Sequence, residues 1–352
     1  MFRKNIFIFF IGVILIFTTS CGSNNNKPNE ETNTAPTVST ESSNTQKEST
    51  PESSVSSDPD FVFPDANRPI AVMIDNEGVK PLPQGGLNKA QVIYEIIVEG
   101  GATRLMPMFW GTDPTLIGPV RSSRHYFLDY SMEHDAIYVH FGGSPMAYTD
   151  LKKLHINDLD GVTGRDGGVF WDLTKDRNNW QDSYTSMEKI KEQIKKLKYK
   201  TTTEKKLVFA YNKQGVEPIN GQQAAKVSIQ YTKDYWCGFT YEPATKKYLR
   251  FRKDKTHMER TDNQQLTAKN IIIQNVSNNT IAGDKAGRQV LGDVGKGDGW
   301  FITCGKAIKI KWSKTSRDAQ TKYMDESGTG IILNPGQTWV EILPLSGKVK
   351  LE

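Results

Sequence analysis

Apolar runs alternate with helix-like segments over residues 61–203. A buried strand is expected at residues 68–74, followed by a helix that Asn88 caps and that ends near Gly100-Gly101. Further strands are expected at residues 103–110 and 135–141, and further helices at residues 122–132, 144–154 and 186–197. This alternation predicts an α/β domain with a largely parallel sheet over residues 61–203.

The pattern changes in the second half of the chain. Short apolar runs are separated by turns rich in Gly, Asp, Asn and Lys, which is typical of antiparallel strands. The expected strands lie at residues 207–211, 226–231, 248–252, 270–274, 300–304, 308–312, 330–333 and 338–343. We therefore expect a β-rich domain, mainly antiparallel, over residues 204–352.

The N-terminus has the order of a secretory signal peptide. Arg3 and Lys4 precede an apolar run at residues 6–17, and small residues lead to Cys21. This run is shorter than the ~20 residues that a membrane-spanning helix needs. Thr-Thr-Ser-Cys-Gly resembles a lipobox, although Thr18 stands where Leu is usual. We expect residues 1–20 to be removed and Cys21 to be diacylated; an uncleaved anchor and a plain secreted protein are the alternatives.

The segment after Cys21 contains little that could form a core. Residues 22–60 are mostly Asn, Ser, Thr, Glu and Pro, with three apolar residues, Ala35, Val38 and Val55. Such a composition does not offset the chain entropy of folding. We expect residues 21–60 to be a disordered tether of roughly 35 Å root-mean-square length, with the folded body outside the cell membrane.

Charge and cysteine content narrow the candidate partners. The chain carries a formal net charge of +5, and the tether is acidic, so the body is more basic than the whole chain. A basic surface suits anionic lipid headgroups or wall polymers, although solvated lysines are the ordinary explanation. We expect no nucleic acid partner, because the body lies outside the cell.

Besides Cys21 there are Cys237 and Cys304, which could form a disulfide or remain buried thiols. No zinc motif is present, so neither a metal nor a cofactor is expected.

Polar clusters follow the expected strands, where α/β sheets usually bind ligands. Helix N-termini favour anions, glycines allow close backbone approach, and arginines add forked donors. The clusters predict a pocket for an anionic ligand, and ordinary turns with surface arginines are the alternative. The candidate ligand-binding residues are Asp75, Asn76, Arg104, Arg121, Ser122, Arg124, His140, Gly142, Gly143 and Ser144.

Two carboxylates are candidates for catalysis. Glu95 and Glu99 are four residues apart on the expected first helix, and therefore on one face. They could form ion pairs with Arg104 or Arg121, or act as a general acid or base. A Ser144–His140–Asp75 triad has weaker support, because the serine lacks the Gly-x-Ser-x-Gly spacing.

Several longer runs carry a family resemblance, namely residues 68–76, 98–101, 103–104, 117–124, 139–145, 270–274 and 334–339. They resemble the DUF3048 family, typified by YerB-type lipoproteins of Gram-positive bacteria. The resemblance extends from about Asn67 to the end of the chain and includes the family's separate C-terminal domain. It implies an exported lipoprotein with two domains, and the family has no established biochemical activity.

Three functional hypotheses follow. The first is a surface lipoprotein that binds an anionic envelope ligand, such as a peptidoglycan fragment or the phosphate of a teichoic acid. The second is an envelope hydrolase or transferase that uses Glu95 or Glu99. The third is an interaction scaffold that uses the basic and aromatic surface of the β-rich domain, where Trp300, Trp312 and Trp339 either pack in the core or form an aromatic surface.

Overall fold

The computed structural model describes residues 61–176, 179, 181–218 and 220–352. The signal peptide at residues 1–20, Cys21 and the tether at residues 21–60 lie outside the described residues, so these predictions are not tested by the fold. None of the helices within the described ranges is long and apolar enough to cross a membrane.

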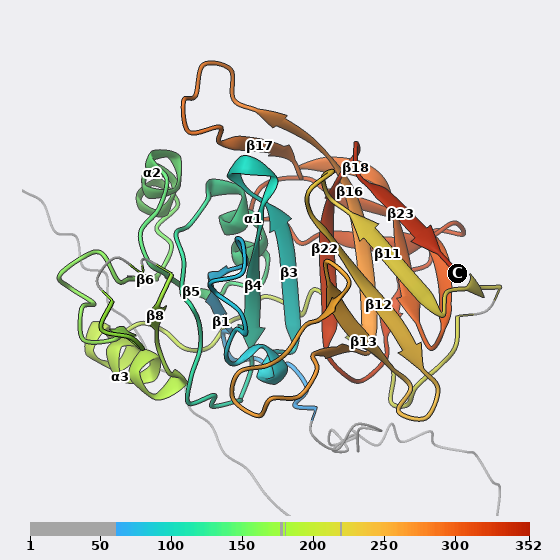
Figure 1. Cartoon of the computed structure of the whole chain (residues 1–352), viewed down its shortest axis with the longest axis horizontal. Helices are drawn as coiled ribbons and strands as arrows, with labels where there is room; N and C mark the ends of the chain where they lie inside the picture. The colour runs from blue at the N-terminus through green and yellow to red at the C-terminus, as the bar shows by residue number, and fades with distance from the viewer. Residues whose placement is uncertain (1–60, 177–178, 180, 219) are drawn as a thin grey trace, which may run out of the picture. The chain divides into compact units, whose positions relative to one another are not determined.

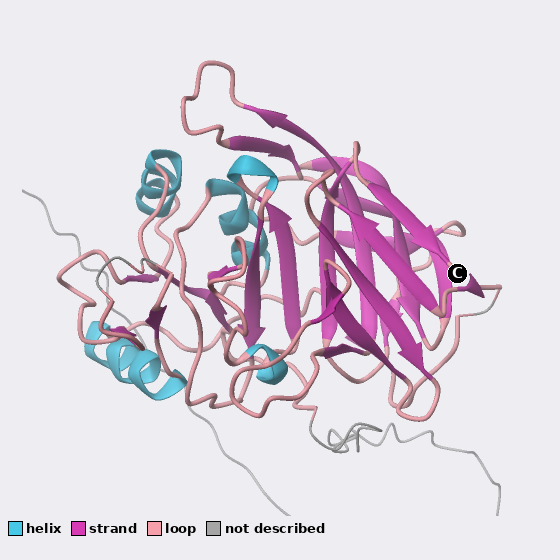
Figure 2. Cartoon of the chain, in the orientation of Figure 1, coloured by secondary structure: helices cyan, strands magenta, loops and turns pink. Residues whose placement is uncertain are grey.

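The helices all lie in the N-terminal region of the described chain (Figure 2). Ser144 and Ser186 cap α2 and α3, because each side chain accepts a hydrogen bond from a backbone N–H three residues later. The elements are β1 (Ile70–Val72), β2 (Ile74–Asp75), η1 (Leu87–Lys89), β3 (Val92–Ile97), η2 (Glu99–Gly101), β4 (Thr103–Phe109), α1 (His125–Glu133), β5 (Ile137–His140), α2 (Pro145–Lys153), β6 (Asp158–Asp160), β7 (Trp171–Asp172), β8 (Ser183–Tyr184) and α3 (Met187–Leu197).

The C-terminal region consists of strands and connecting turns. Most pairs are antiparallel, as the short alternating runs predict. The strands are β9 (Ala210–Tyr211), β10 (Gln222–Gln223), β11 (Lys226–Gln230), β12 (Trp236–Glu242), β13 (Lys247–Arg252), β14 (Lys255–Thr256), β15 (Thr267–Ala268), β16 (Asn270–Thr280), β17 (Gln289–Gly292), β18 (Gly295–Thr303), β19 (Lys306–Lys314), β20 (Lys322–Asp325), β21 (Ile332–Leu333), β22 (Thr338–Pro344) and β23 (Lys348–Leu351).

One large sheet runs through both regions. Its strand order is β10-β19-β18-β16-β22-β3-β4-β1-β5-β6, and the parallel pair β22–β3 joins the C-terminal strands to the N-terminal ones. The sheet therefore contains strands from both sides of the expected boundary between residues 203 and 204 (Figure 1). That boundary stays a prediction about how the chain is organised, and it does not separate two independent sheets.

A second sheet packs against the C-terminal part of the first. Its strand order is β14-β13-β12-β11-β23, and β11, β12 and β13 lie in front of β22 and β16 in Figure 1. The ring of Phe239 on β12 lies 6.2 Å from the ring of Trp339 on β22, and both side chains are buried. The space between the sheets is therefore a true interior, in which any charged group needs a partner.

The predicted fold class is confirmed. The N-terminal region combines helices with a mixed sheet, in which β1–β5 and β5–β6 are parallel pairs, and the C-terminal region is mostly antiparallel. The helix expected after Asn88 is wrong, because residues 92–97 form β3, at the centre of the large sheet. All six of its residues are buried, and Val92, Ile93 and Ile96 are β-branched side chains that favour a strand.

Candidate functional site

Three arginines gather near the start of α1. Arg104 lies on β4, while Arg121 and Arg124 lie in the segment that leads into α1. Arg104 is 3% exposed, and its Nη1 donates a 2.5 Å hydrogen bond to the carbonyl of Ser122. Burial, and then the charges of Arg124 and Arg121, lower the pKa of Arg104 to about 10. The three guanidinium groups are thus close enough to repel one another, and we call them the arginine cluster.

One donor of the arginine cluster lacks an acceptor. The Nε of Arg104 is buried, and it makes no hydrogen bond within the described part of the chain. A buried donor without an acceptor costs roughly 1–3 kcal/mol. The missing acceptor therefore raises the free energy of the folded protein at this position.

Two carboxylates balance part of the charge. Asp75 Oδ2 lies 3.1 Å from Arg121 Nε and also accepts a 2.9 Å hydrogen bond from Gln181. Arg124 donates two hydrogen bonds, of 2.5 and 2.8 Å, to the carboxylate of Glu99. Burial acts to raise the pKa of Glu99, but the hydrogen bonds and charge of Arg124 hold it below its ordinary value. Asp75 and Glu99 thus act as counterions in this structure.

The glycine turn lies next to the arginine cluster. Gly142 has a φ of +77°, and a Cβ at this position would lie 3.5 Å from the Oγ of Ser122. Gly143 forms a bridge with Ser123, and the carbonyl of Gly142 accepts a hydrogen bond from the Ser123 N–H. The turn and the arginine-bearing segment are therefore held together by backbone contacts, as the sequence-based hypothesis requires.

The polar groups of this turn mainly have structural partners. The Gly142 N–H donates to Asp160 Oδ1 at 2.8 Å, and the Ser144 hydroxyl caps α2. His140 is fully buried, with Nδ1 2.7 Å from the Gly142 carbonyl and Nε2 3.3 Å from Asp158 Oδ2. A Ser144–His140–Asp75 triad is not formed, because each of the three side chains has other partners.

Asn76 belongs to a different environment from Asp75. Its Nδ2 lies within hydrogen-bond distance of Glu95, Thr103 and Tyr235, and its Oδ1 accepts from Arg252 at 2.9 Å. These groups lie in the interior between the two sheets. The structure therefore brings Asp75 to the arginine cluster and places Asn76 in a buried network.

Glu95 is the centre of that network. It lies on β3 opposite Glu341 on β22, and Arg250 on β13 forms ion pairs with both carboxylates. All three side chains are fully buried. The guanidinium carbon of Arg250 also lies 3.7 Å from the ring centroid of Trp339. Arg250 thus holds the two sheets together through charge and stacking.

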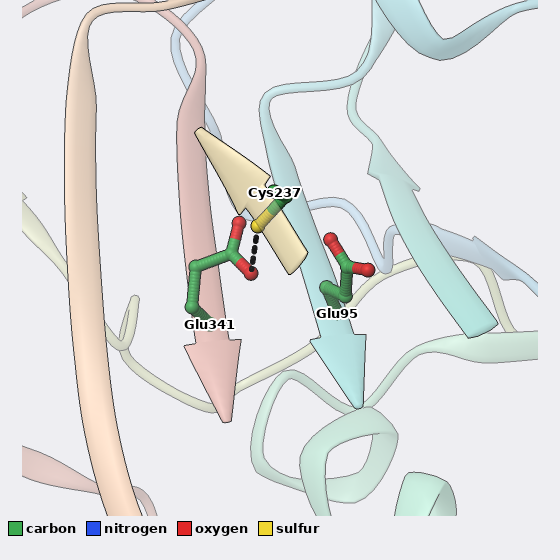
Figure 3. Close-up of side chains that lie close together, drawn as sticks. All are labelled: Glu95, Cys237 and Glu341. Carbon is green, nitrogen blue, oxygen red and sulfur yellow. Dashed lines mark hydrogen bonds between the residues drawn. The ribbon is translucent and has the colours of Figure 1, made fainter. Parts of the chain in front are cut away.

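Cys237 completes a cluster that has the donor types of a metal site. Figure 3 shows its sulfur hydrogen-bonded to Glu341 and lying close to Glu95. The ligand atoms of the three residues lie within 4.8 Å of one another. However, Arg250 already forms ion pairs with both carboxylates, and burial, with the nearby Glu341, raises the pKa of the Cys237 thiol. A metal ion would have to displace a buried guanidinium, so this cluster does not fit a cation.

The single guanidinium of Arg250 is the ion-pair partner of both Glu95 and Glu341. Burial and the charge of Glu95 raise the pKa of Glu341 to about 7, against the opposing effect of Arg250. Tyr231 donates a 2.8 Å hydrogen bond to Glu341, and Tyr235 donates a 2.5 Å hydrogen bond to Glu95. Glu341 is therefore the carboxyl group that takes up a proton near neutral pH.

The structure changes the expectation for the two candidate catalytic carboxylates. Glu95 and Glu99 do not share a helix face, because Glu95 lies on β3 and Glu99 begins η2. Glu95 is inaccessible, and Glu99 is paired with Arg124. Sequence reasoning missed Arg250, Arg252 and Glu341, although β13 carries the signal: its alternate residues Tyr248, Arg250 and Arg252 are the buried ones.

The remaining candidates have simpler environments. Cys237 and Cys304 are both buried free thiols. Trp312 and Trp339 are buried and only Trp300 of the three is partly exposed, so they form no shared aromatic surface. Five of the pockets in the described chain have volumes of 280 to 560 Å³, and other residues than the arginine cluster line them. Arg121 and Arg124 nevertheless keep 19% and 13% of their side chains exposed.

Comparisons with known proteins agree with this architecture. The family described as "Protein of unknown function (DUF3048) N-terminal domain" matches residues 62–200, and the corresponding C-terminal domain family matches residues 225–340. A Bacillus subtilis (strain 168) protein named "Putative lipoprotein YerB" is 30% identical over 79% of this chain and 81% of its own length. The crystal structure of YerB from Bacillus subtilis superposes with a TM-score of 0.70 at 28% identity, covering 81% of this chain and 94% of that one.

Proposed function

This chain belongs to the DUF3048 family, and from that premise we propose that it is a membrane-anchored lipoprotein that binds an anionic polymer of the cell envelope through Arg104, Arg121 and Arg124. The ligand classes that fit are phosphate-bearing wall polymers and carboxylate-bearing peptidoglycan fragments. Both carry oxygen anions that a guanidinium binds through paired hydrogen bonds.

The observation that carries the proposal is the gathering of three guanidinium groups beside two carboxylates, Asp75 and Glu99. Burial lowers the pKa of Arg104, and the charges of Arg124 and Arg121 lower it further. Arg121 and Arg124 are partly exposed, so an anion at the surface can reach them and would reduce the repulsion between the guanidinium groups. This favours binding of an anion over binding of a neutral ligand.

The surroundings favour a polymer over an enclosed small molecule. Arg121 and Arg124 lie at the surface, with 19% and 13% of their side chains exposed. An extended chain with repeated charges can lie across such a surface and contact it at several points. Binding of this kind is screened by salt, so affinity should fall as ionic strength rises.

The test is binding of purified wall teichoic acid and of soluble peptidoglycan fragments to the full chain, measured by calorimetry at low and at physiological salt. We expect Arg121→Gln to weaken binding at least tenfold, since it removes the guanidinium group that is more exposed than that of Arg124. Arg121→Lys should weaken it less, because the charge remains. Because Arg121→Gln removes the ion-pair partner of Asp75, thermal unfolding of each variant would check that the protein is still folded.

The matched control is Arg165→Gln. Arg165 is 42% exposed and pairs with Asp158 and Asp166, so this variant makes the same chemical change away from the arginine cluster. It should bind as the wild type does. If folded Arg121→Gln and wild type bind both polymers equally, or if the wild type binds neither, the proposal is wrong.

Membrane anchoring through Cys21 is the second part of the proposal. The lipobox-like sequence at residues 18–22 and the lipoprotein relative support it, and acylation would place the body on the extracytoplasmic face. A clickable palmitate fed to cells should label the wild type and should not label Cys21→Ser. Equal labelling of both chains would place the lipid elsewhere.

The hydrolase or transferase hypothesis gains no support from the site. A general acid or base must reach the substrate, and Glu95 is sealed between the sheets by Arg250, Asn76 and Tyr235. Glu99 is accessible but has a lowered pKa, which makes it a poor proton donor at neutral pH.

A further inference from the structure

A pocket of about 540 Å³ lies between α3 and the adjoining strands β1, β4 and β5, away from the arginine cluster. Apolar side chains from all four elements line it, including Ile70, Phe109, Ile137, Met187 and Ile194. This volume is within the range of roughly 300–1,000 Å³ in which small-molecule sites fall. The pocket therefore has both the size and the apolar lining of a ligand site.

The charged residues that line this pocket are all basic: Arg68, Lys191, Lys195 and Lys198. Arg68 lies 3.3 Å from Asp135, and Lys191 is paired with Asp113. Lys195 and Lys198, both exposed, form no ion pair with any described residue. Two ammonium groups at the C-terminal end of α3 are therefore available to a ligand.

We propose that this pocket binds a long-chain fatty acid, with the alkyl chain on the apolar lining and the carboxylate at Lys195 and Lys198. The two features together define the ligand class. An inorganic anion would leave the apolar lining unused, and a neutral lipid would leave the two ammonium groups without a partner. A single alkyl chain with one anionic head satisfies both.

The site is chemically distinct from the proposed polymer site. It combines apolar burial with charge, so binding of the fatty acid persists at salt concentrations that weaken a purely ionic complex. The chain's own acyl groups are an alternative occupant, but lipids on Cys21 carry no carboxylate head for Lys195 and Lys198. Charge complementarity therefore favours a free fatty acid.

The experiment uses the full chain reconstituted in nanodiscs of neutral phosphatidylcholine. A diazirine-bearing palmitic acid is added, crosslinked by light and located by proteolysis and mass spectrometry. We expect crosslinks in the peptides that contain Met187 to Lys198 and Ile70. The double variant Lys195→Glu, Lys198→Glu should reduce them at least fivefold, because the carboxylate would then meet two like charges.

The matched control is Lys152→Glu, Lys153→Glu, which makes the same charge change on exposed residues of α2. It should crosslink as the wild type does, and so should Arg121→Gln, which tests the polymer site. Unlabelled palmitic acid should compete with the probe, and hexadecanol should compete at least tenfold less well.

Three outcomes would overturn the inference. The first is crosslinking that is spread over the surface or is unchanged in Lys195→Glu, Lys198→Glu. The second is equal competition by hexadecanol, which would remove the role of the anionic head. The third is a much stronger signal in Cys21→Ser than in the wild type, which would make the chain's own lipid the occupant.

Discussion

Arg250 forms a fully buried ion pair with Glu95, although 155 positions separate the two residues in the sequence. The pair joins β13 of the second sheet to β3 of the first, and Arg250 also pairs with Glu341 on β22. Because β3 comes from the N-terminal region and β13 and β22 from the C-terminal region, this contact connects both halves of the family's architecture. Its first consequence is for stability.

Replacing Arg250 with Met should destabilise the protein strongly. The variant leaves the carboxylates of Glu95 and Glu341 buried without their cation, which typically costs about 3–5 kcal/mol. The measurement is urea unfolding followed by tryptophan fluorescence. Lys311→Met, which breaks an exposed pair with Asp298, should cost less than about 1 kcal/mol. A similar small loss in Arg250→Met would show that the ion pairs contribute little to the fold.

The protonation of Glu341 should make stability depend on pH. Its pKa is about 7 in the folded state against an ordinary value of 4.5, so its favourable contribution is present below pH 4.5 and is lost as pH rises through 7. The loss amounts to roughly 3 kcal/mol at most. Glu341→Gln stays neutral throughout, so its stability relative to wild type should increase over this window.

The check is urea unfolding of wild type and Glu341→Gln at several pH values from 4 to 8. Glu326→Gln, on an exposed turn, provides the control and should follow the wild type. Parallel stability curves for wild type and Glu341→Gln would mean that Glu341 keeps its ordinary pKa in the folded protein.

Buried thiols should be unreactive until the protein unfolds. Cys237 is fully buried, and burial raises the pKa of its thiol, so little reactive thiolate forms. In the Cys21→Ser chain, a thiol reagent such as Ellman's should detect no thiol in the native state and two in urea. A reducing agent should leave the unfolding midpoint unchanged. Detection of a bond between Cys237 and Cys304 would contradict the structure.

The local elements were largely predictable from the sequence, with one instructive exception. Helices α2 and α3 were predictable because Ser144 and Ser186 act through their own neighbours in the chain. β3 was not, because Asn88 and Gly100 resemble helix ends. What makes residues 92–97 a strand is pairing with β22, which lies far along the chain, as well as with β4.

The same limit applies to the site. The arginine cluster and the glycine turn were predictable because both follow strands of one short region. The environment of Glu95 was not, because Arg250, Tyr235 and Glu341 come from strands that only the packed sheets bring together. A buried arginine on a half-buried strand, such as Arg250, is the feature that sequence reasoning can use to anticipate such a network.

Ser144→Ala should affect stability and leave ligand binding unchanged. Its hydroxyl accepts a hydrogen bond from the Ala147 N–H at 3.1 Å, so it serves as the cap of α2. Loss of such a cap costs about 1 kcal/mol. Ser186→Ala removes the equivalent cap of α3 and should cost a similar amount in urea unfolding. If Ser144→Ala weakened polymer binding while Ser186→Ala did not, Ser144 would be a ligand contact.

Glu99→Gln should strengthen binding of an anionic polymer. Glu99 holds Arg124 through two hydrogen bonds and neutralises its charge, so the amide would free one donor and leave the charge of Arg124 uncompensated. We expect affinity for wall teichoic acid to rise severalfold at low salt, and less at physiological salt because of screening. Asp284→Asn, in the surface pair with Arg288, removes the same charge elsewhere and should change affinity little.

The hydrolase hypothesis predicts the opposite for Glu99, namely loss of function. A decrease in affinity in Glu99→Gln would therefore argue that the carboxylate itself contacts the ligand, and that the arginine cluster is not an anion site.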